Sequence, residues 1–182
     1  MKWMIASDIH GSAHWCGRML ERFDREGAER LVLLGDLLYH GPRNPLPEGY
    51  APMEVAALLN ARRDRILAVR GNCDAEIDQM VLEWPMMQDS LLLVVEGQTV
   101  FATHGHVFDE TKPPKLHKGD ILLNGHTHLQ VCEQCGDFIH MNPGSVSIPK
   151  GDSTNGYMTW ENGEFLWKDM DGNILKTWRQ EK

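Results

Sequence analysis

Short apolar runs alternate with amphipathic segments of helical length through the first half of the chain. The apolar runs cover residues 2–7, 30–35 and 65–71, and the amphipathic segments cover 13–26 and 52–63. Within these segments apolar residues recur at intervals of three and four, which places them on one side of a helix. Strands that alternate with helices in this way are typical of a parallel sheet.

From residue 90 the apolar runs follow one another closely, without helix-length segments between them. We predict a hairpin over 90–105 with its turn at Glu96-Gly97-Gln98. Further strands are predicted in four segments, 120–125, 130–142, 156–169 and 173–179. An α/β layered sandwich with a mixed or two-sheet core fits this change of pattern better than a purely doubly wound sheet.

Two segments have the composition of irregular loops. Residues 40–52 contain four prolines and two glycines, so they are predicted to form a stiff excursion rather than a helix. Residues 107–119 contain the pair Pro113-Pro114 and form the second loop. Long loops of compact domains are often functional, so the place where each loop leaves the chain matters.

A length of 182 residues fits one folded domain, and residues 1–182 are predicted to form a single domain. The first residues lack the basic start and long apolar stretch of a signal peptide, and no apolar run is long enough to cross a bilayer. We therefore expect no membrane association and a cytoplasmic location. The four cysteines show no disulfide pattern, in keeping with a reducing compartment.

The formal net charge of −8 argues against a general nucleic-acid surface, because phosphate-backbone binding depends on clustered Lys and Arg. A small anionic substrate remains compatible with this charge, since bound divalent metal reverses the sign of a local field. Trp160, Trp167 and Trp178 fall in the predicted C-terminal strands, in the core or on an oligomer face. The sequence therefore leaves open whether the chain forms a homo-oligomer.

Polar side chains with metal-binding chemistry follow five of the apolar runs. In chain order they are Asp8, His10, Asp36, Asn72, His104, His126 and His128. The carboxyl ends of parallel strands share one edge of a sheet, so these side chains can converge although they lie far apart in sequence. Each one alone would more often be a helix cap, a turn or a surface imidazole, but the full series at successive strand ends favours a site.

Two carboxylates, one amide oxygen and four imidazoles form a mixed nitrogen and oxygen ligand set. Such a set suits Mn²⁺, Fe²⁺ or Zn²⁺ and contains too much nitrogen for Mg²⁺ or Ca²⁺ alone. Seven ligands are too many for one ion, but two ions about 3.5–4 Å apart, bridged by a carboxylate and water, would use them all. The central Asp36 is the natural bridge. We predict two divalent ions per chain, with Mn²⁺ favoured over Fe, Ni or Zn.

Six short motifs resemble those of the calcineurin-like metallophosphoesterases. They are DIHG at 8–11, GD at 35–36, GNCD at 71–74, HGH at 104–106, GHTH at 125–128 and NPGS at 142–145. The chain is similar, up to about residue 150, to the small bacterial and archaeal branch of YfcE-type phosphodiesterases. This resemblance implies a four-layer α/β/β/α sandwich with mixed β-sheets and two metals on one edge. It places Asp8, His10, Asp36 and His128 on the first metal and Asp36, Asn72, His104 and His126 on the second.

The resemblance also implies a metal-dependent phosphodiesterase that hydrolyses small phosphodiesters by attack of a metal-bridging hydroxide. Asn72 would ligate and also donate its amide N–H to a phosphate oxygen. Cys73 stands where many larger members of the superfamily have a His that protonates the leaving group or steadies the phosphate. Asn72 and Cys73 are therefore the candidate catalytic residues. A thiol stabilises charge less well than an imidazolium, which counts against efficient hydrolysis of poor leaving groups.

Both predicted loops begin directly after predicted ligands. We therefore expect residues 40–52 and 107–119 to border the metal edge and to select the substrate. Candidate substrate-binding residues are Arg43, His106, Lys112 and Lys115.

Three alternatives stay open beside the phosphodiesterase. A phosphomonoesterase would use the same metal centre and differ in its loops. A Vps29-like scaffold protein resembles this fold but has lost part of the metal set, whereas all seven ligands are present here. A DNA-processing nuclease of the Mre11 type would carry extra domains and basic surfaces.

Cys132 and Cys135 have half the spacing of a zinc site. No second Cys or His pair in the sequence completes that site, so the pair is interpreted as part of a hairpin. His140, close by, is predicted not to be a ligand.

Overall fold

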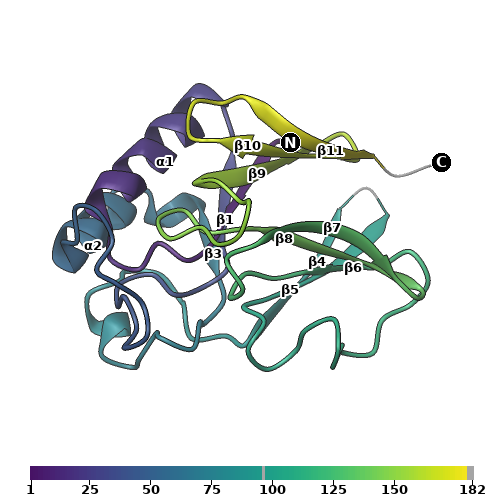
Figure 1. Cartoon of the computed structure of the whole chain (residues 1–182), viewed down its shortest axis with the longest axis horizontal. Coiled ribbons are helices and arrows are strands. Elements are labelled where there is room, and N and C mark those ends of the chain that lie inside the picture. The colour runs from purple at the N-terminus through teal and green to yellow at the C-terminus, as the bar shows by residue number, and fades with distance from the viewer. Residues whose placement is uncertain (96, 180–182) are drawn as a thin grey trace.

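Two β-sheets pack face to face in this computed structural model, and two helices cover the outer face of one sheet (Figure 1). The structure describes residues 1–95 and 97–179. The helices are α1 Ala13–Arg25 and α2 Pro52–Asn60, followed by the short 3-10 turns η1 Arg63–Arg65 and η2 Asp78–Met80. The strands are β1 Trp3–Ala6, β2 Arg30–Leu33, β3 Ile66–Ala68, β4 Ser90–Val95, β5 Gln98–Thr103, β6 Ile121–Leu123, β7 Gln130–Cys135, β8 Phe138–Pro143, β9 Gly156–Glu161, β10 Glu164–Asp169 and β11 Ile174–Arg179.

Each sheet is mixed and contains a parallel group of three strands. The six-stranded sheet has the order β11-β10-β9-β1-β2-β3, in which β1, β2 and β3 are parallel. The five-stranded sheet has the order β4-β5-β6-β8-β7, in which β5, β6 and β8 are parallel. Antiparallel hairpins complete both sheets. The parallel groups bring their carboxyl ends to a common edge of each sheet.

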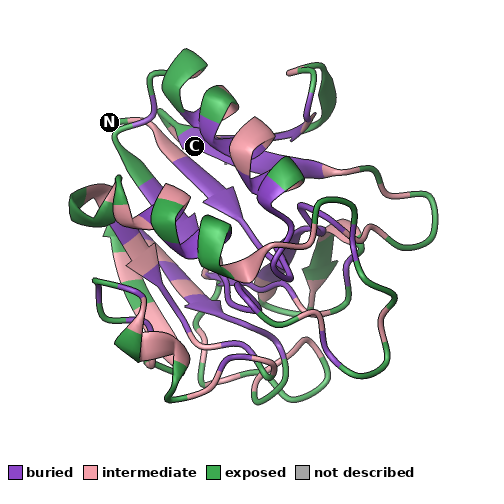
Figure 2. Cartoon of the chain, turned by 90° about the vertical axis from the view of Figure 1, so that its left-hand side faces the viewer, coloured by how far each residue is buried: buried purple, intermediate pink, exposed green. Residues whose placement is uncertain are grey.

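Burial on both faces explains the continuous apolar runs of the first strands. In β1, Met4 belongs to the core under the helices, whereas Ile5 belongs to the core between the two sheets. Leu31 and Val32 of β2 divide in the same way. Since successive side chains of a strand point to opposite faces, a strand covered on both faces needs apolar residues at every position. Figure 2 shows these strands buried between the two layers that flank them.

Helix α1 forms because its start is capped and one of its faces is apolar. Ser12 precedes the helix and its hydroxyl accepts a hydrogen bond from the Trp15 N–H at 3.2 Å. Cys16, Met19 and Phe23 recur at intervals of three and four and are fully buried. The predicted helix over 13–26 is therefore confirmed almost to the residue.

The second helix is shorter than its predicted range. The prediction covers 52–63, but α2 ends at Asn60 and a separate 3-10 turn follows. Pro52 stands at the start of α2, where its missing N–H costs no helical hydrogen bond. Residues 40–51 before it form no helix or strand, as their prolines predict.

The predicted α/β fold with two packed mixed sheets is confirmed, with one difference in its layers. Among the described residues no helix covers the outer face of the five-stranded sheet, so the helical layer expected there is replaced by the irregular segment 105–120. Phe108 of this segment packs edge-on against Phe101 of β5, with ring centroids 5.7 Å apart. Pro113-Pro114 prevents the segment from continuing as a helix.

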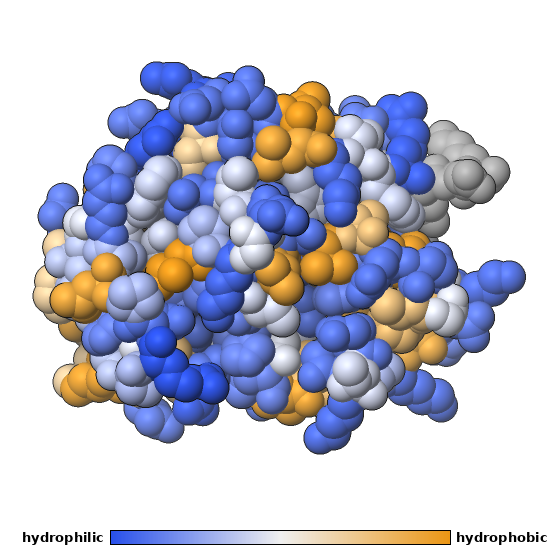
Figure 3. Space-filling model, viewed as in Figure 1, coloured by the Kyte–Doolittle hydropathy of each residue, from blue (hydrophilic) through white to orange (hydrophobic). Residues whose placement is uncertain are grey.

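The strands of the second half lie where the sequence predicts them. β4 and β5 pair as the expected hairpin, although Glu96 of the predicted turn lies outside the described residues. Trp160 and Trp167 lie in the core between the sheets, and Trp178 packs against it while partly exposed. Within the described part of the chain, no helix has the length and apolar character needed to cross a membrane. On the face seen in Figure 3, hydrophobic residues form small groups among hydrophilic ones.

A partly buried charge cluster ties the end of α1 to three neighbouring strands of the six-stranded sheet, β1, β9 and β10. Glu26 accepts hydrogen bonds from Lys2 Nζ and Lys168 Nζ, each at 2.6 Å, and from the Tyr157 hydroxyl at 2.9 Å. Burial raises the pKa of Glu26, but Lys168, Lys2 and Tyr157 outweigh it and lower the pKa to about 2. Folding therefore favours the ionised form of Glu26 over the protonated form.

We expect Glu26→Gln to lower the free energy of unfolding by about 2 kcal/mol near neutral pH, because Lys168 then stays buried without its counter-charge. The wild type has this stabilisation above pH 4.5 and loses it as the pH falls toward about 2, so the variant should show a flatter acid dependence. Urea denaturation at several pH values measures both effects. Glu29→Gln is the matched control, because Glu29 is 58% exposed. Equal losses in the two variants would contradict the prediction.

Candidate metal centre

All seven predicted ligands lie at one edge of the molecule, where the parallel strands of both sheets end. Asp8 and His10 follow β1, Asp36 follows β2, and Asn72 follows β3 after a short turn. The ligands His104, His126 and His128 come from the second sheet, after β5 and β6. The two sheets meet here, since His10 Nε2 lies 3.2 Å from His128 Nε2.

Five of these seven residues adopt a left-handed backbone conformation, which non-glycine residues rarely do. Their φ angles are 58° at Asp8, 50° at His10, 55° at Asp36, 68° at His126 and 64° at His128. Such strain costs on the order of 1 kcal/mol per residue and persists only where the surroundings impose it. Here the left-handed residues turn the chain just after the strands β1, β2 and β6.

Backbone hydrogen bonds between neighbouring turns hold the strained residues. Asp8 N–H donates to the Gly35 carbonyl at 3.1 Å, and His10 N–H donates to the Asp36 carbonyl at 2.9 Å. The hydroxyl of Ser145 donates to the Asp8 carbonyl at 2.8 Å. The turns after β1 and β2 and the NPGS motif therefore support one another.

Asp74 is a positioning residue whose role the sequence alone did not reveal. Its buried carboxylate accepts hydrogen bonds from the backbone N–H groups of Asp36 and Leu37, both at 2.8 Å, and of Gly71 at 2.7 Å. Asp74 thus joins the turns after β2 and β3. The GNCD motif carries the only sequence signal for it, as its last residue.

Two glycines are required by close approach of their neighbours. A Cβ at Gly71 would collide with the Asp36 carboxylate, and a Cβ at Gly125 would collide with the Ser7 hydroxyl and press on Asp8. These contacts explain the glycines that open the GNCD and GHTH motifs.

Three histidines are oriented by backbone carbonyls. The Nδ1 atoms of His10, His104 and His128 lie 2.9, 2.6 and 2.5 Å from the carbonyls of Tyr39, Leu34 and Ile148. A carbonyl can only accept a hydrogen bond, so each Nδ1 carries the proton. Each neutral ring therefore directs the lone pair of Nε2 into the centre, which is how metal-binding histidines are held.

The first ligand group consists of Asp8, His10 and His128. Asp8 Oδ1 lies 3.5 Å from His10 Nε2 and 3.2 Å from His128 Nε2. This oxygen is buried and has no hydrogen-bond donor among the described residues. The other oxygen, Oδ2, accepts from the Ser7 hydroxyl at 2.6 Å and from the His126 N–H at 3.0 Å. One carboxylate oxygen is thus held by donors and the other is free for a cation.

The second ligand group consists of Asp36, Asn72, His104 and His126. His104 Nε2 lies 3.4 Å from Asp36 Oδ2, 3.1 Å from Asn72 Oδ1 and 3.2 Å from His126 Nδ1. Asp36 Oδ2 also lies 3.7 Å from His10 Nε2, while Oδ1 accepts from the Cys73 N–H at 2.8 Å. The Asp36 carboxylate therefore stands between the two groups.

The spacing of these atoms fits divalent metal ions. Bonds of about 2.1 Å from a metal to nitrogen or oxygen place neighbouring ligand atoms about 3.0–3.4 Å apart. Most of the distances in both groups lie near this range, and each joins atoms that present lone pairs rather than a donor and an acceptor. The donor set thus fits a cation in each group.

Without a metal, protons must balance the buried carboxylates. Burial raises the pKa of Asp8, but the neighbouring imidazoles of His10 and His128 outweigh it and lower the pKa well below its usual range. Burial lowers the pKa of His104, but the carboxylates of Asp36 and Asp8 outweigh it and raise the pKa to about 9. A metal must therefore displace protons from imidazoles at neutral pH.

A cavity of about 420 Å³ opens onto this edge. Arg43 lines it on the side of the 40–52 loop, and Lys150 lines it although sequence reasoning had not singled it out. The predicted ligands along its wall are Asp36, Asn72, His126 and His128. The cavity thus combines the metal edge with two cationic side chains.

Cys73 also lines this cavity, beside Asn72. Burial and the nearby Asp36 carboxylate raise the pKa of its thiol to about 12. In the metal-free chain the thiol therefore stays neutral near pH 7.

The other predicted substrate-binding residues do not line this cavity. His106 is exposed, with its ring centroid 5.4 Å from that of His104, and it does not line the cavity. No residue of 107–119 lines it either, so the expectation that this loop, with Lys112 and Lys115, borders the metal edge and selects the substrate stays a prediction. Phe108 of this loop packs edge-on against Phe101 of β5.

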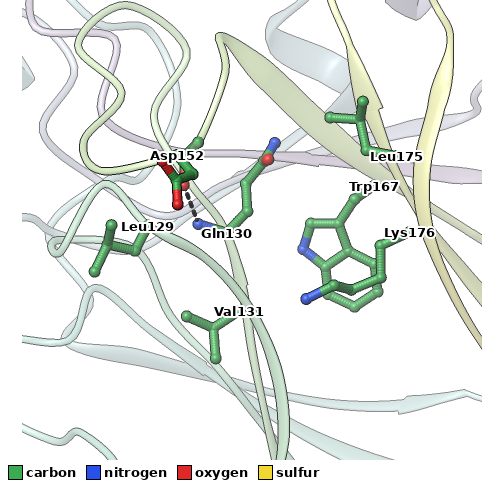
Figure 4. Close-up of a pocket in the computed structure, with 8 residues that line it drawn as sticks. Leu129, Gln130, Val131, Asp152, Trp167, Leu175 and Lys176 are labelled. Atoms are coloured by element: carbon green, nitrogen blue, oxygen red, sulfur yellow. Dashed lines mark hydrogen bonds between the residues drawn. The ribbon is translucent and has the colours of Figure 1, made fainter.

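A second cavity, of about 390 Å³, lies beside β7, β10 and β11 (Figure 4). It contains none of the predicted ligands. Its lining residues are Leu129, Gln130, Val131, Asp152, Ser153, Trp167, Leu175 and Lys176. The metal-ligand chemistry therefore belongs to the first cavity.

Comparisons with known proteins agree with this geometry. Residues 1–163 match the model of the calcineurin-like phosphoesterase superfamily domain. The chain is 52% identical over 162 residues to phosphodiesterase YfcE of Escherichia coli K12, covering 89% of this chain and 88% of that protein. A solved structure of the E. coli phosphoesterase Yfce has a TM-score of 0.95 at 48% identity and covers 98% of this chain and 99% of that one. Wild-type Vps29 of Entamoeba histolytica, solved with Zn²⁺, has a TM-score of 0.61 at 17% identity and covers 99% and 98%, a likeness of fold alone.

We expect the affinity for Mn²⁺ to rise with pH, because His104 holds a proton below its pKa of about 9. The apparent Kd should fall about tenfold per pH unit up to that value and then level off. Calorimetric titration in buffers of different ionisation enthalpy measures both the affinity and the released protons. His117→Gln, in an exposed position, is a control that should follow the wild type. An affinity independent of pH would contradict the prediction.

Proposed function

The chain belongs to the calcineurin-like phosphoesterase superfamily and is a metal-dependent phosphoesterase; from that premise we propose that it hydrolyses small phosphodiesters with two divalent ions. Asp8, His10, Asp36 and His128 would hold the first ion. Asp36, Asn72, His104 and His126 would hold the second. We assign a preference for diesters because the relative that is 52% identical to this chain is named a phosphodiesterase.

The position of Asp36 is the observation that carries this proposal. Its Oδ2 faces His10 on one side and His104 on the other, at 3.7 and 3.4 Å. A carboxylate between two groups of lone-pair donors is the arrangement of a two-metal hydrolase. The unpartnered Asp8 Oδ1 adds a second buried acceptor that a cation would satisfy.

The ligand set favours a first-row divalent ion, with Mn²⁺ as our first choice and Fe, Ni or Zn as alternatives. When bound, two such ions supply a positive field for the phosphoryl oxygens and lower the pKa of a coordinated water so that it can attack phosphorus. Asp8 and Asp36 contribute only two negative charges, so the loaded centre is positive within an acidic protein.

The side chains along the cavity would bind and orient the substrate. Arg43 and Lys150 offer positive charge to a phosphate oxygen or to an anionic group on the ester. Asn72 can donate an amide N–H to the phosphate while its Oδ1 faces the centre. The neutral Cys73 thiol lies beside the position of the leaving group in this proposal, and His106 stands at the outer rim.

The metal centre favours an enzyme over a scaffold, because all seven ligand residues are present and backbone carbonyls orient three of the imidazoles. A phosphomonoesterase remains the alternative that the same centre would serve. The absence of general nucleic-acid binding, a cytoplasmic location and a homo-oligomeric state stay predictions from the sequence.

We expect chelator-stripped protein to hydrolyse bis(p-nitrophenyl) phosphate only after Mn²⁺, Ni²⁺ or Zn²⁺ is restored, and to hydrolyse p-nitrophenyl phosphate more slowly. Asp36→Asn removes the shared charge and should reduce kcat/KM by about 100-fold or more. Asp24→Asn is the matched control, because Asp24 lies on the remote helix α1 in an exposed ion pair. Metal-independent turnover would overturn the metal mechanism, and faster monoester hydrolysis would replace the diesterase by a monoesterase.

We expect Arg43→Met and Lys150→Met each to raise KM for the diester about tenfold while kcat stays within about twofold, because each removes a charge-assisted contact with bound substrate. Lys115→Met is the matched control, since Lys115 does not line the cavity. Steady-state kinetics with Mn²⁺ at saturation separates KM from kcat. An unchanged KM in both cavity variants would remove these two side chains from substrate binding.

A further inference from the structure

The β7–β8 hairpin gathers a second group of metal-binding side chains, away from the phosphoesterase centre. Glu133 and Cys135 are two residues apart on β7, so they share one face of the sheet. His140 of β8 lies directly opposite Glu133 in the antiparallel register. Ile139 and Met141 on either side of His140 belong to the core between the sheets. The three side chains therefore lie on the outer face of the five-stranded sheet.

Cys132 does not join this group. It is an odd number of positions from Cys135, so it points to the opposite face, where it packs against the core between the sheets. The pair is thus part of a hairpin, as interpreted from the sequence, and its spacing does not indicate which residues meet. The partners of Cys135 are Glu133, on the same face of β7, and His140, on the neighbouring strand β8.

The protonation of His140 is fixed by a buried amide network. The Oδ1 of Asn142 accepts the Gly144 N–H at 2.8 Å, so Nδ2 of Asn142 is a donor, and it lies 3.2 Å from Asn124 Oδ1. Asn124 Oδ1 is therefore an acceptor, and it lies 2.9 Å from His140 Nε2. Nε2 must carry a proton, which leaves Nδ1 of the neutral ring with its lone pair.

That lone pair faces a carboxylate. His140 Nδ1 lies 3.2 Å from Glu133 Oε1, and the His140 side chain is only 4% exposed. A positive charge between the two atoms, a proton or a metal ion, removes their repulsion. A second carboxylate, that of Glu110 in the 105–120 segment, lies 3.9 Å from Nε2. Among the described residues neither Glu110 nor Glu133 forms an ion pair with Lys or Arg.

We propose that Glu133, Cys135 and His140 form a separate binding site for one Zn²⁺ ion. One ligand atom of each residue lies within 4.8 Å of the other two, so small side-chain rotations bring all three to a common ion. A thiolate, an imidazole and a carboxylate suit Zn²⁺, and a tetrahedral site with three protein ligands leaves a fourth position for water. The Asn124 amide oxygen accepts the hydrogen bond from His140 Nε2–H and so orients the imidazole.

The thiol of Cys135 is protonated in the metal-free chain, so a metal ion must displace its proton. Burial and the adjacent Glu133 carboxylate raise its pKa, so the thiol stays protonated until a cation arrives. Binding would break the S–H bond, form a metal–sulfur bond and release the proton to solvent. Cys135 is partly exposed and Glu133 is exposed, so an ion can enter from solvent.

Cobalt provides a direct test, because only a thiolate ligand produces an intense sulfur-to-cobalt charge-transfer band in the near ultraviolet. The full chain is stripped of metal and titrated with Co²⁺, and metal bound per chain is then measured with Zn²⁺. We expect the wild type to develop the band and Cys135→Ser to lose it together with one Zn²⁺ per chain. Glu133→Gln should weaken the affinity of the site for Co²⁺, measured from the growth of the band, about tenfold.

Two matched variants locate the signal. Cys132→Ser lies on the same strand but faces the core, and Cys73→Ser removes the thiol beside the phosphoesterase centre. Both should keep the band. A band that persists in Cys135→Ser, or that disappears in Cys73→Ser, would overturn the proposal, as would a wild type without any thiolate band. Diester hydrolysis by Cys135→Ser should equal that of the wild type, so failure of this site would leave the proposed function untouched.

Discussion

Mutual repulsion of lone-pair donors at one edge is the constraint on which the rest of this structure depends. Nitrogen and oxygen atoms from both sheets face one another at 3.1–3.7 Å, most of them without a hydrogen atom between them when the imidazoles are neutral. Protons can relieve this repulsion in the metal-free chain, and divalent ions relieve it more fully. A fold that holds these atoms together must therefore obtain its stability elsewhere.

The sheets and their turns provide that stability. Strands buried on both faces form a rigid frame, and the strained left-handed residues stand directly at its edge, where backbone hydrogen bonds and the Asp74 carboxylate hold them. Carbonyl groups fix the proton of three imidazoles on Nδ1 before any ion arrives. The centre is thus preorganised, and binding energy is not spent on ordering its ligands.

Charge is distributed so that an acidic protein can bind an anion. The whole chain carries a net charge of −8, yet the cavity is lined by Arg43 and Lys150 beside the metal edge. The loop that reaches this cavity is the proline-rich one, whereas the second loop lies over the outer sheet face and contacts β5 through Phe108. The two cationic side chains that line the cavity therefore come from the 40–52 loop and from the segment after β8.

The sequence by itself determined the kinds and order of elements and the seven candidate ligands, because strand ends and glycine turns are local features. It also placed helix α1 and the hairpins within a residue or two, since their apolar periodicity is regular. Tertiary structure decided what depends on contacts between distant segments: that Asp74 clamps two turns, that Lys150 reaches the cavity, and that the 107–119 loop does not. It also decided that Cys135 meets His140 rather than Cys132, because strand register and the two faces of a sheet, not distance along the chain, set which side chains come together.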